Sequence, residues 1–260
     1  MNNNRNILIT NDDGIMAKGL HALIEMARPY GKITVVAPKE PQSGMSNAVT
    51  LNSPLRLFEY KQEEGVIYFV CTGAPVDCVK IGMSQLFQND LPNLLLSGIN
   101  HGSNASAAVL YSGTLGAAAE GVLYGIPSIG FSLTTPHNPD ADFTASIFYG
   151  RMILEHYFKF PPSPDVYLNI NIPEIPINKI QGIRIARQGK GAWIKEFEKR
   201  IDPHGKSYYW LTGDFRNDEP SASDTDTNLL DRGYITIVPH QVDSTHYPEL
   251  ERLKKIWIFN

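Results

Sequence analysis

The first half of the chain alternates short apolar runs with segments of helical periodicity, and this order limits the folds open to it. Apolar runs at 6–10, 32–38, 93–97 and 126–133 predict buried strands, and the patterns at 17–30, 75–87, 113–125 and 143–159 predict helices. A strand–helix order of this kind favours a parallel sheet with helices on both faces. The strands are apolar throughout, as is typical of strands covered on both sides. We therefore expect an α/β fold.

The second half of the chain has a different pattern. Segments 165–173, 179–188 and 206–215 alternate in polarity or are rich in aromatic residues, with Pro and Gly between them, which predicts antiparallel strands outside the main sheet. Segment 221–239 predicts a short capped helix followed by a strand, and the tail predicts a short helix with an apolar end. We expect one domain, 1–260, with a core of 1–174 and 226–240, a protruding β-hairpin lobe at 175–225 and a C-terminal arm at 241–260.

Composition and charge exclude several classes of protein. Apolar residues make up 42% of the chain, charged residues make up 19%, and the net charge is -4, so we expect no general attraction to a nucleic acid polymer. No apolar run approaches the roughly 20 residues that cross a bilayer, and the N-terminus lacks a signal-peptide core. The two cysteines, Cys71 and Cys78, form neither a disulfide framework nor a CxxC pair. These features favour a cytoplasmic protein without a membrane anchor.

The segment after the first predicted strand carries adjacent carboxylates. In an open parallel sheet, ligands bind beyond the carboxyl ends of the strands. Here "TNDDG" places Asn11, Asp12, Asp13 and Gly14 at such an end. Two neighbouring carboxylates repel each other unless a cation lies between them, which favours a hard divalent ion bound through oxygen. The alternative is an Asx turn that caps the next helix.

Three further segments are expected to meet this one. The loop at 37–50 contains Ser43 and Gly44. The segment "LLLSGINHGSN" (94–104) supplies Asn100 and Asn104, and its glycines Gly98 and Gly102 let the backbone come close to a ligand. Ser112-Gly113-Thr114 precede a predicted helix, whose free amides suit an anion, although Ser112 or Thr114 also suits ordinary N-capping. Together these groups predict a metal site facing a phosphate site. The corresponding chemistry is hydrolysis of a phosphate ester.

These segments resemble the survival protein SurE family of nucleotidases. The resemblance rests on "ILITNDDG", "APKEPQSGMSNAVTL", "TGAPVDCVKIG", "SGINHGSN", "YSGTLGAAAEG", "LNINIPEIP", "GIRIARQG" and "TDTNLLDRGYITIVP", in this order over nearly the whole chain. It implies a Rossmann-like core and hydrolysis of nucleoside 5'-monophosphates, and sometimes 3'-monophosphates. It also implies one divalent metal ion per subunit, Mg²⁺ or Mn²⁺, and homodimers or homotetramers that exchange C-terminal segments.

The resemblance also assigns roles to single residues. It implies metal ligation by four side chains, those of Asp12, Asp13, Ser43 and Asn100, with the two aspartates as the catalytic pair. It implies phosphate binding by Asn104, Ser112, Gly113 and Thr114. We further expect Asn11, Gly44 and His101 near the substrate. His101 either donates to the phosphate, acts as general acid or points away.

Other nucleotide and phosphate motifs fit less well. Haloacid-dehalogenase-like phosphatases need a D-x-D spacing, whereas Asp12 and Asp13 are adjacent. Neither a G-x-G-x-x-G fingerprint nor a P-loop is present, since Arg200 stands where the first P-loop glycine would precede "GKS" at 205–207. A non-catalytic nucleotide sensor on the same scaffold remains the alternative. Phosphate release from a nucleoside monophosphate distinguishes an enzyme from a sensor.

Overall fold

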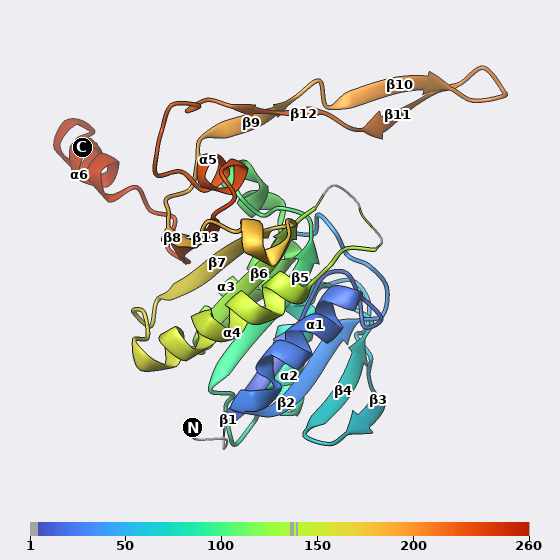
Figure 1. Ribbon diagram of the computed structural model, residues 1–260. Coiled ribbons are helices and arrows are strands. Elements are labelled where there is room, and N and C mark those ends of the chain that lie inside the picture. The colour runs from blue at the N-terminus through green and yellow to red at the C-terminus, as the bar shows by residue number, and fades with distance from the viewer. Residues whose placement is uncertain (1–4, 136–137, 139, 260) are drawn as a thin grey trace.

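The computed structural model describes residues 5–135, 138 and 140–259. In this part of the chain a nine-stranded sheet has the order β3-β4-β2-β1-β5-β6-β7-β13-β8 (Figure 1). The strands are β1 (Arg5–Thr10), β2 (Gly31–Pro38), β3 (Leu57–Glu63), β4 (Val66–Cys71), β5 (Leu94–His101), β6 (Ser128–Thr134), β7 (Val166–Pro173), β8 (Ile183–Ile185) and β13 (Ile235–Gln241). The six strands from β4 to β7 in this order pair in parallel. This confirms the predicted α/β fold.

Helices cover both faces of the sheet. The helices of the described residues are α1 (Lys18–Ala27), α2 (Pro75–Gln85), α3 (Gly113–Leu123), α4 (Thr144–Lys159), α5 (Asp226–Asp231) and α6 (Tyr247–Ile256), with 3₁₀ turns η1 (Arg28–Tyr30), η2 (Ser106–Tyr111) and η3 (Ile177–Lys179), and α6 lies away from the sheet (Figure 1). Helix α1 packs beside α4, and α2 packs beside α3. Each pair forms one layer of a three-layer arrangement (Figure 1).

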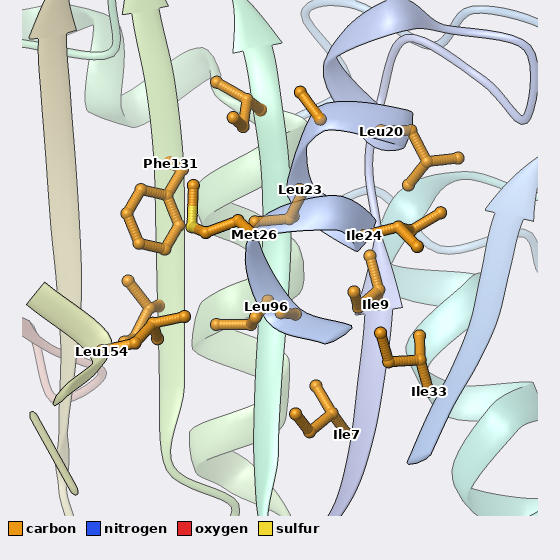
Figure 2. Packing of buried hydrophobic residues seen from close by; sticks show 14 of the residues in the cluster. Ile7, Ile9, Leu20, Leu23, Ile24, Met26, Ile33, Leu96, Phe131 and Leu154 are labelled. Atoms are coloured by element: carbon orange, nitrogen blue, oxygen red, sulfur yellow. The ribbon is translucent and has the colours of Figure 1, made fainter. Parts of the chain in front are cut away.

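The core is divided by the sheet into two apolar layers. On one face Leu23 and Met26 of α1 pack with Leu96, Phe131 and Leu154 (Figure 2). The opposite face buries a second cluster that includes Leu8, Val36, Leu95, Cys78 and Met83. Successive residues of the central strands, such as Leu94, Leu95 and Leu96, therefore point to opposite faces and are all buried, which is why these strands are continuous apolar runs in the sequence.

The predicted placement of two C-terminal segments is wrong. Strands β7 and β8 were expected outside the main sheet, but β7 pairs in parallel with β6, and β8 pairs in parallel with β13. The polarity alternation of β7 comes from Asn169 and Asn171, which are fully buried and hydrogen-bonded to each other. Alternation of polar and apolar residues usually indicates a strand with one solvent-exposed face. Here the polar residues of the alternation are buried and hydrogen-bonded. The antiparallel hairpin of β3 and β4 was not predicted.

Strand β5 continues beyond the predicted end of its apolar run. It extends to His101, and its pairing with β6 shifts register between Ser97 and Asn100. Gly98 has a φ of +126°, and a Cβ there would lie 2.3 Å from the Phe131 carbonyl oxygen, so only glycine fits. Gly98 thus allows close strand pairing, whereas we expected it to admit a ligand. Asn100 and His101 are consequently held at a strand end and not in a free loop.

Two small antiparallel sheets form a lobe that projects from the core (Figure 1). Strand β9 (Gly191–Ile194) pairs with β12 (Asp214–Asn217) at its base, and β10 (Phe197–Ile201) pairs with β11 (Ser207–Leu211) beyond it. All ten residues of β10 and β11 are exposed. This confirms the antiparallel strands predicted at 206–215.

Candidate metal and phosphate site

Asp12 and Asp13 lie just beyond the carboxyl end of β1, at the edge of the sheet where ligands bind in such folds. Asp12 is buried and Asp13 is half-buried. The Thr114 hydroxyl donates to Asp12 Oδ1 at 2.6 Å, and the His101 amide donates to Asp13 Oδ2 at 3.1 Å. The structure therefore brings the start of α3 and the end of β5 to the two carboxylates.

The electrostatic setting of this pair is unfavourable for two negative charges. Burial, followed by the charge of Asp13, raises the pKa of Asp12 from 3.8 to about 6, against the opposing effect of the Thr114 hydrogen bonds. Burial also raises the pKa of Asp13, although the His101 amide and ring oppose the shift. A bound cation would relieve both penalties. The pair thus has the electrostatics expected of a cation site.

Gly113 allows the start of α3 to touch Asp12. A Cβ at Gly113 would lie 3.0 Å from the Asp12 Cβ and 3.1 Å from Pro75 Cγ, so a larger residue would push the carboxylate or the helix aside. Ser112 caps the helix, because its hydroxyl oxygen accepts from the Leu115 amide at 3.1 Å. The N-capping alternative is therefore observed for Ser112. Its hydroxyl hydrogen can still donate to an anion.

The loop that contains Ser43 and Gly44 runs past the carboxylates. The Gln42 amide donates to the Asp12 carbonyl oxygen at 2.7 Å, which places Ser43 one residue beyond this contact. Both Ser43 and Gly44 are exposed. The Ser46 hydroxyl donates to the Leu110 carbonyl oxygen at 2.8 Å, and this fixes the far end of the loop against η2.

Asn100 presents an oxygen at the end of β5. Its Nδ2 donates to the Gly102 carbonyl oxygen at 2.7 Å, which leaves Oδ1 free of that contact. Among the described residues no cluster of three or more His, Cys, Asp and Glu side chains is suited to a metal. The side chains predicted as metal ligands at this edge are two carboxylates, a hydroxyl and an amide, and all of them offer hard oxygen atoms.

Two predicted substrate-contact residues carry buried atoms without a hydrogen-bond partner. Asn11 is fully buried and donates from Nδ2 to the Gly14 carbonyl oxygen at 2.9 Å, but its Oδ1 has no partner. The His101 Nε2 is likewise buried and unpaired, and its ring lies 5.6 Å from that of Phe143. Unpaired buried polar atoms are costly, and a bound ligand, ion or water is one way in which they are satisfied.

Asn104 lies within a buried polar network. Its Nδ2 donates to Ser132 Oγ at 2.8 Å, and its backbone amide donates to Asn171 Oδ1 at 2.9 Å. Its carbonyl oxygen accepts from Asn169 Nδ2 at 2.9 Å. The structure therefore places Asn104 beside the site with its main chain held by β7. Sequence reasoning missed Asn169 and Asn171, although two asparagines in an otherwise apolar strand were the available signal.

Asp226, at the start of α5, is the other residue that sequence reasoning missed. It is fully buried, and its carboxylate accepts from the amides of Ser106 and Gly189, each at 2.8 Å. Ser106 begins η2, which leads into Ser112 and α3. Asp226 thus connects the base of the lobe to the loop before the segment 112–114, which is predicted to bind phosphate.

Comparison with known proteins identifies the family. A family model described as "Survival protein SurE" matches residues 7–195, which include every residue predicted for the site. The chain belongs to the SurE family. This confirms the resemblance in the sequence motifs.

Relatives in the SurE family match over nearly the whole chain. The 5'-nucleotidase SurE of Phocaeicola vulgatus is 44% identical over 248 residues, 95% of either chain. That of Flavobacterium johnsoniae is 43% identical over 255 residues, 98% of this chain and 97% of the relative. The crystal structure of the SurE protein from Aquifex aeolicus has a TM-score of 0.83 and 33% identity, covering 97% of this chain and all of that one. The fold class agrees with this SurE structure.

Proposed function

We propose that this chain hydrolyses nucleoside monophosphates to nucleoside and phosphate, as a 5'-nucleotidase that also accepts 3'-monophosphates. The relatives named 5'-nucleotidase SurE support this proposal. The observation that carries it is the contact between the Asp12-Asp13 pair and the start of α3, made by the Thr114 hydroxyl. It sets a group of cation ligands directly against a helix N-terminus, which favours anions.

The residues present fit one divalent ion per subunit, Mg²⁺ or Mn²⁺. Asp12 and Asp13 would hold it, and Ser43 and Asn100 would complete the oxygen set. The raised pKa of Asp12 shows that burial and Asp13 disfavour its charge, which a cation would offset. When bound, the ion supplies a Lewis acid against the charge of the phosphoryl oxygens.

Side chains and backbone amides of the chain itself position the attacking water and the phosphate. The Thr114 hydroxyl and the His101 amide fix the two carboxylates, so one of them can orient the attacking water and accept its proton. The Gly113 amide and the Ser112 hydroxyl are donors for the phosphate at the start of α3. Asn104 lies in the same segment as Asn100, and Asn11 Oδ1 and His101 Nε2 are buried atoms without a hydrogen-bond partner.

Phosphate release tests the proposal. With Mn²⁺ or Mg²⁺ present, we expect the protein to release inorganic phosphate from a panel of nucleoside 5'- and 3'-monophosphates. Heat-inactivated protein and a reaction in excess chelator are the controls. Tight nucleotide binding without any turnover would contradict the proposal and would favour the nucleotide sensor.

We also propose that the protein acts in the cytoplasm as a homodimer or homotetramer. None of the helices in the described residues combines the length and apolar character needed to cross a bilayer. Cys71 and Cys78 are buried free thiols, in keeping with a reducing compartment. The lobe and the C-terminal arm are the segments that we assign to contacts between subunits, because both expose apolar side chains.

Deletion of residues 241–260 is expected to lower the molecular mass in solution. Helix α6 buries none of its residues, and Trp257, Ile258 and Phe259 are all more than 60% exposed, so a partner subunit is the natural cover for them. Light scattering after size exclusion measures the effect. A Glu251→Gln variant of the same helix should keep the full mass. An unchanged mass after the deletion would show that the arm does not hold the oligomer together.

A further inference from the structure

A groove of about 420 Å³ is lined by both chain neighbours of Asn104, one of the residues predicted to bind phosphate. Its walls come from the loop after β5, the end of β6, the base of the lobe and the end of α5. The residues that line it include Ser103, Ala105, Thr134, Phe215, Leu230 and Asp231. Figure 1 shows α5 and the lobe base above this edge of the sheet. The volume is within the range of about 300–1,000 Å³ that small-molecule sites occupy.

The groove adjoins the loop of the candidate site in the sequence. Ser103 and Ala105 flank Asn104, and they follow Asn100 in the same loop. Thr134 is the last residue of β6, which is two strands from β1 in the sheet order β1-β5-β6. Neighbouring strands lie about 4.8 Å apart, so β6 is offset from β1 by roughly 10 Å across the sheet. This lateral offset is comparable to the length of a nucleoside.

The aromatic wall of the groove is held in one position. The Phe215 ring packs edge-to-face on Trp193, with 5.7 Å between ring centroids. The ring also lies against Gly191, where a Cβ would come within 2.3 Å of Phe215 Cζ. Because both contacts lie within the pair β9–β12, the ring is positioned before any ligand enters. A fixed aromatic face is what stacks on a nucleobase.

The remaining walls provide groups that complement the other parts of a nucleoside. Ala105 and Leu230 add apolar surface. Ser103 and Thr134 add hydroxyls, and the Asp231 carboxylate can accept hydrogen bonds from ribose hydroxyls or base amino groups. Asp231 also places a negative charge away from the phosphate-binding segment, which disfavours a second phosphate there.

The two walls of the groove are joined by hydrogen bonds. Asn228 of α5 accepts from Asn217 Nδ2 of β12 at 2.7 Å and donates to the Glu219 carbonyl oxygen at 2.8 Å. Asp226, at the other end of α5, accepts from the Ser106 amide. Helix α5 is therefore bound both to the lobe and to the loop of the phosphate site. Such a groove needs little reorganisation to bind a ligand.

We propose that this groove receives the nucleoside part of the substrate, with the base against Phe215. The inference rests on the proposed nucleotidase function and names where the nucleoside is bound. Phe215 and Leu230 are then specificity-determining residues, and the metal and phosphate site acts on the phosphate at the groove's inner end.

Kinetic and binding measurements with two variants test this inference. Phe215→Ala removes the ring, and Leu230→Trp fills the groove while leaving the ring in place. With Mn²⁺ present, we expect either change to raise the KM for AMP about 10-fold, the order expected for a lost base–aromatic stack, with kcat within about twofold of wild type. Inhibition by adenosine should weaken by a similar factor. Inhibition by inorganic phosphate should not change.

A second groove provides the matched control. It lies on β3 and β4 and also borders the segments after β1 and β2, is lined by Phe58 and Tyr60 among others, and includes no residue of the segment 98–134. Phe58 is half exposed, so Phe58→Ala removes an aromatic ring of the same size at little risk to the fold. We expect this variant to leave the KM for AMP and both inhibition constants at wild-type values.

Two results would overturn the inference. One is an unchanged KM for AMP in both groove variants. The other is an equal weakening of adenosine and phosphate inhibition, which would indicate a general disturbance of the site. Calorimetric titration with adenosine makes the same comparison without turnover. A wild-type protein that binds adenosine but releases no phosphate would therefore contradict the nucleotidase function and still test the groove.

Discussion

Asp12→Asn is expected to lower phosphate release by at least about 100-fold and, at the same time, to stabilise the metal-free protein. Loss of even an outer partner of a metal ligand costs up to about 100-fold in activity, and the proposed site loses a direct ligand here. Asp13→Asn should have the same effect on activity. Rates of phosphate release from AMP with saturating Mn²⁺ measure this loss.

The stabilisation follows from the sign of the pKa shift. The pKa of Asp12 rises from 3.8 to about 6 on folding, so the folded protein disfavours the charged carboxylate. The penalty is full above pH 6 and disappears as the pH falls toward 3.8. Two units correspond to about 3 kcal/mol, and asparagine, which is never charged, should recover about 1–3 kcal/mol at pH 7.5. Urea unfolding in chelator measures the change.

Asp77→Asn is the matched control, because Asp77 is a buried carboxylate with a structural role. Its oxygens accept from the Ala74 amide at 2.9 Å, the Thr50 amide at 3.0 Å and the Thr50 hydroxyl at 2.6 Å. Asparagine offers only one acceptor oxygen, so this variant should lose about 1–3 kcal/mol. Equal losses of stability in the Asp12 and Asp77 variants would mean that Asp12 is structural. Normal turnover in both the Asp12 and Asp13 variants would remove the pair from the mechanism.

Metal binding should raise the thermal stability of the protein at pH 7.5 but not at pH 5. A ligand at 100 times its dissociation constant stabilises a protein by about 2.7 kcal/mol. Metal ligands must be deprotonated, and the raised pKa of Asp12, about 6, means that protons displace the metal below that pH. Affinity should thus fall as the pH falls through 6. Calorimetric scans with Mn²⁺ or with EDTA at the two pH values measure the difference in Tm.

The Asp12→Asn variant is the internal control for these scans, and two results would contradict the proposed metal site. The Asp12→Asn variant should show no Mn²⁺-dependent rise in Tm at either pH. Phosphate release should stop in EDTA and return when Mn²⁺ or Mg²⁺ is added in excess. Identical wild-type Tm values with Mn²⁺ and with EDTA at pH 7.5, or full activity in excess chelator, would contradict the proposed metal site.

Local patterns in the chain predicted much of the fold and part of the site. Residues 6–10 and 93–97 were identifiable as buried strands because each is apolar and short, and their parallel pairing follows from the helices between them. Asp12 and Asp13 stood out because two carboxylates directly follow a buried strand. Ser112-Gly113-Thr114 stood out because they precede a helix. Each of these signals is contained within a few consecutive residues.

Other features depend on contacts between segments far apart in the chain. The alternation in β7 predicted an exposed strand, but Asn169 and Asn171 are buried. Their side chains are satisfied by hydrogen bonds with the backbone of Asn104, which lies more than 60 residues earlier in the chain. Asp226 had no local signal, since its partners Ser106 and Gly189 come from other parts of the chain. Nothing in the sequence indicated that Phe215 lies beside the loop of Asn104.

The sequence by itself determined the α/β class, the family and the identity of the chemical groups, because apolar periodicity and short motifs are local properties of a chain. Only the tertiary structure decided which groups meet: that β7, β13 and β8 extend the sheet, that Gly113 touches Asp12, and that α5 closes a groove beside the site. Hydrogen bonding and burial of side chains depend on non-local packing, which local periodicity does not record.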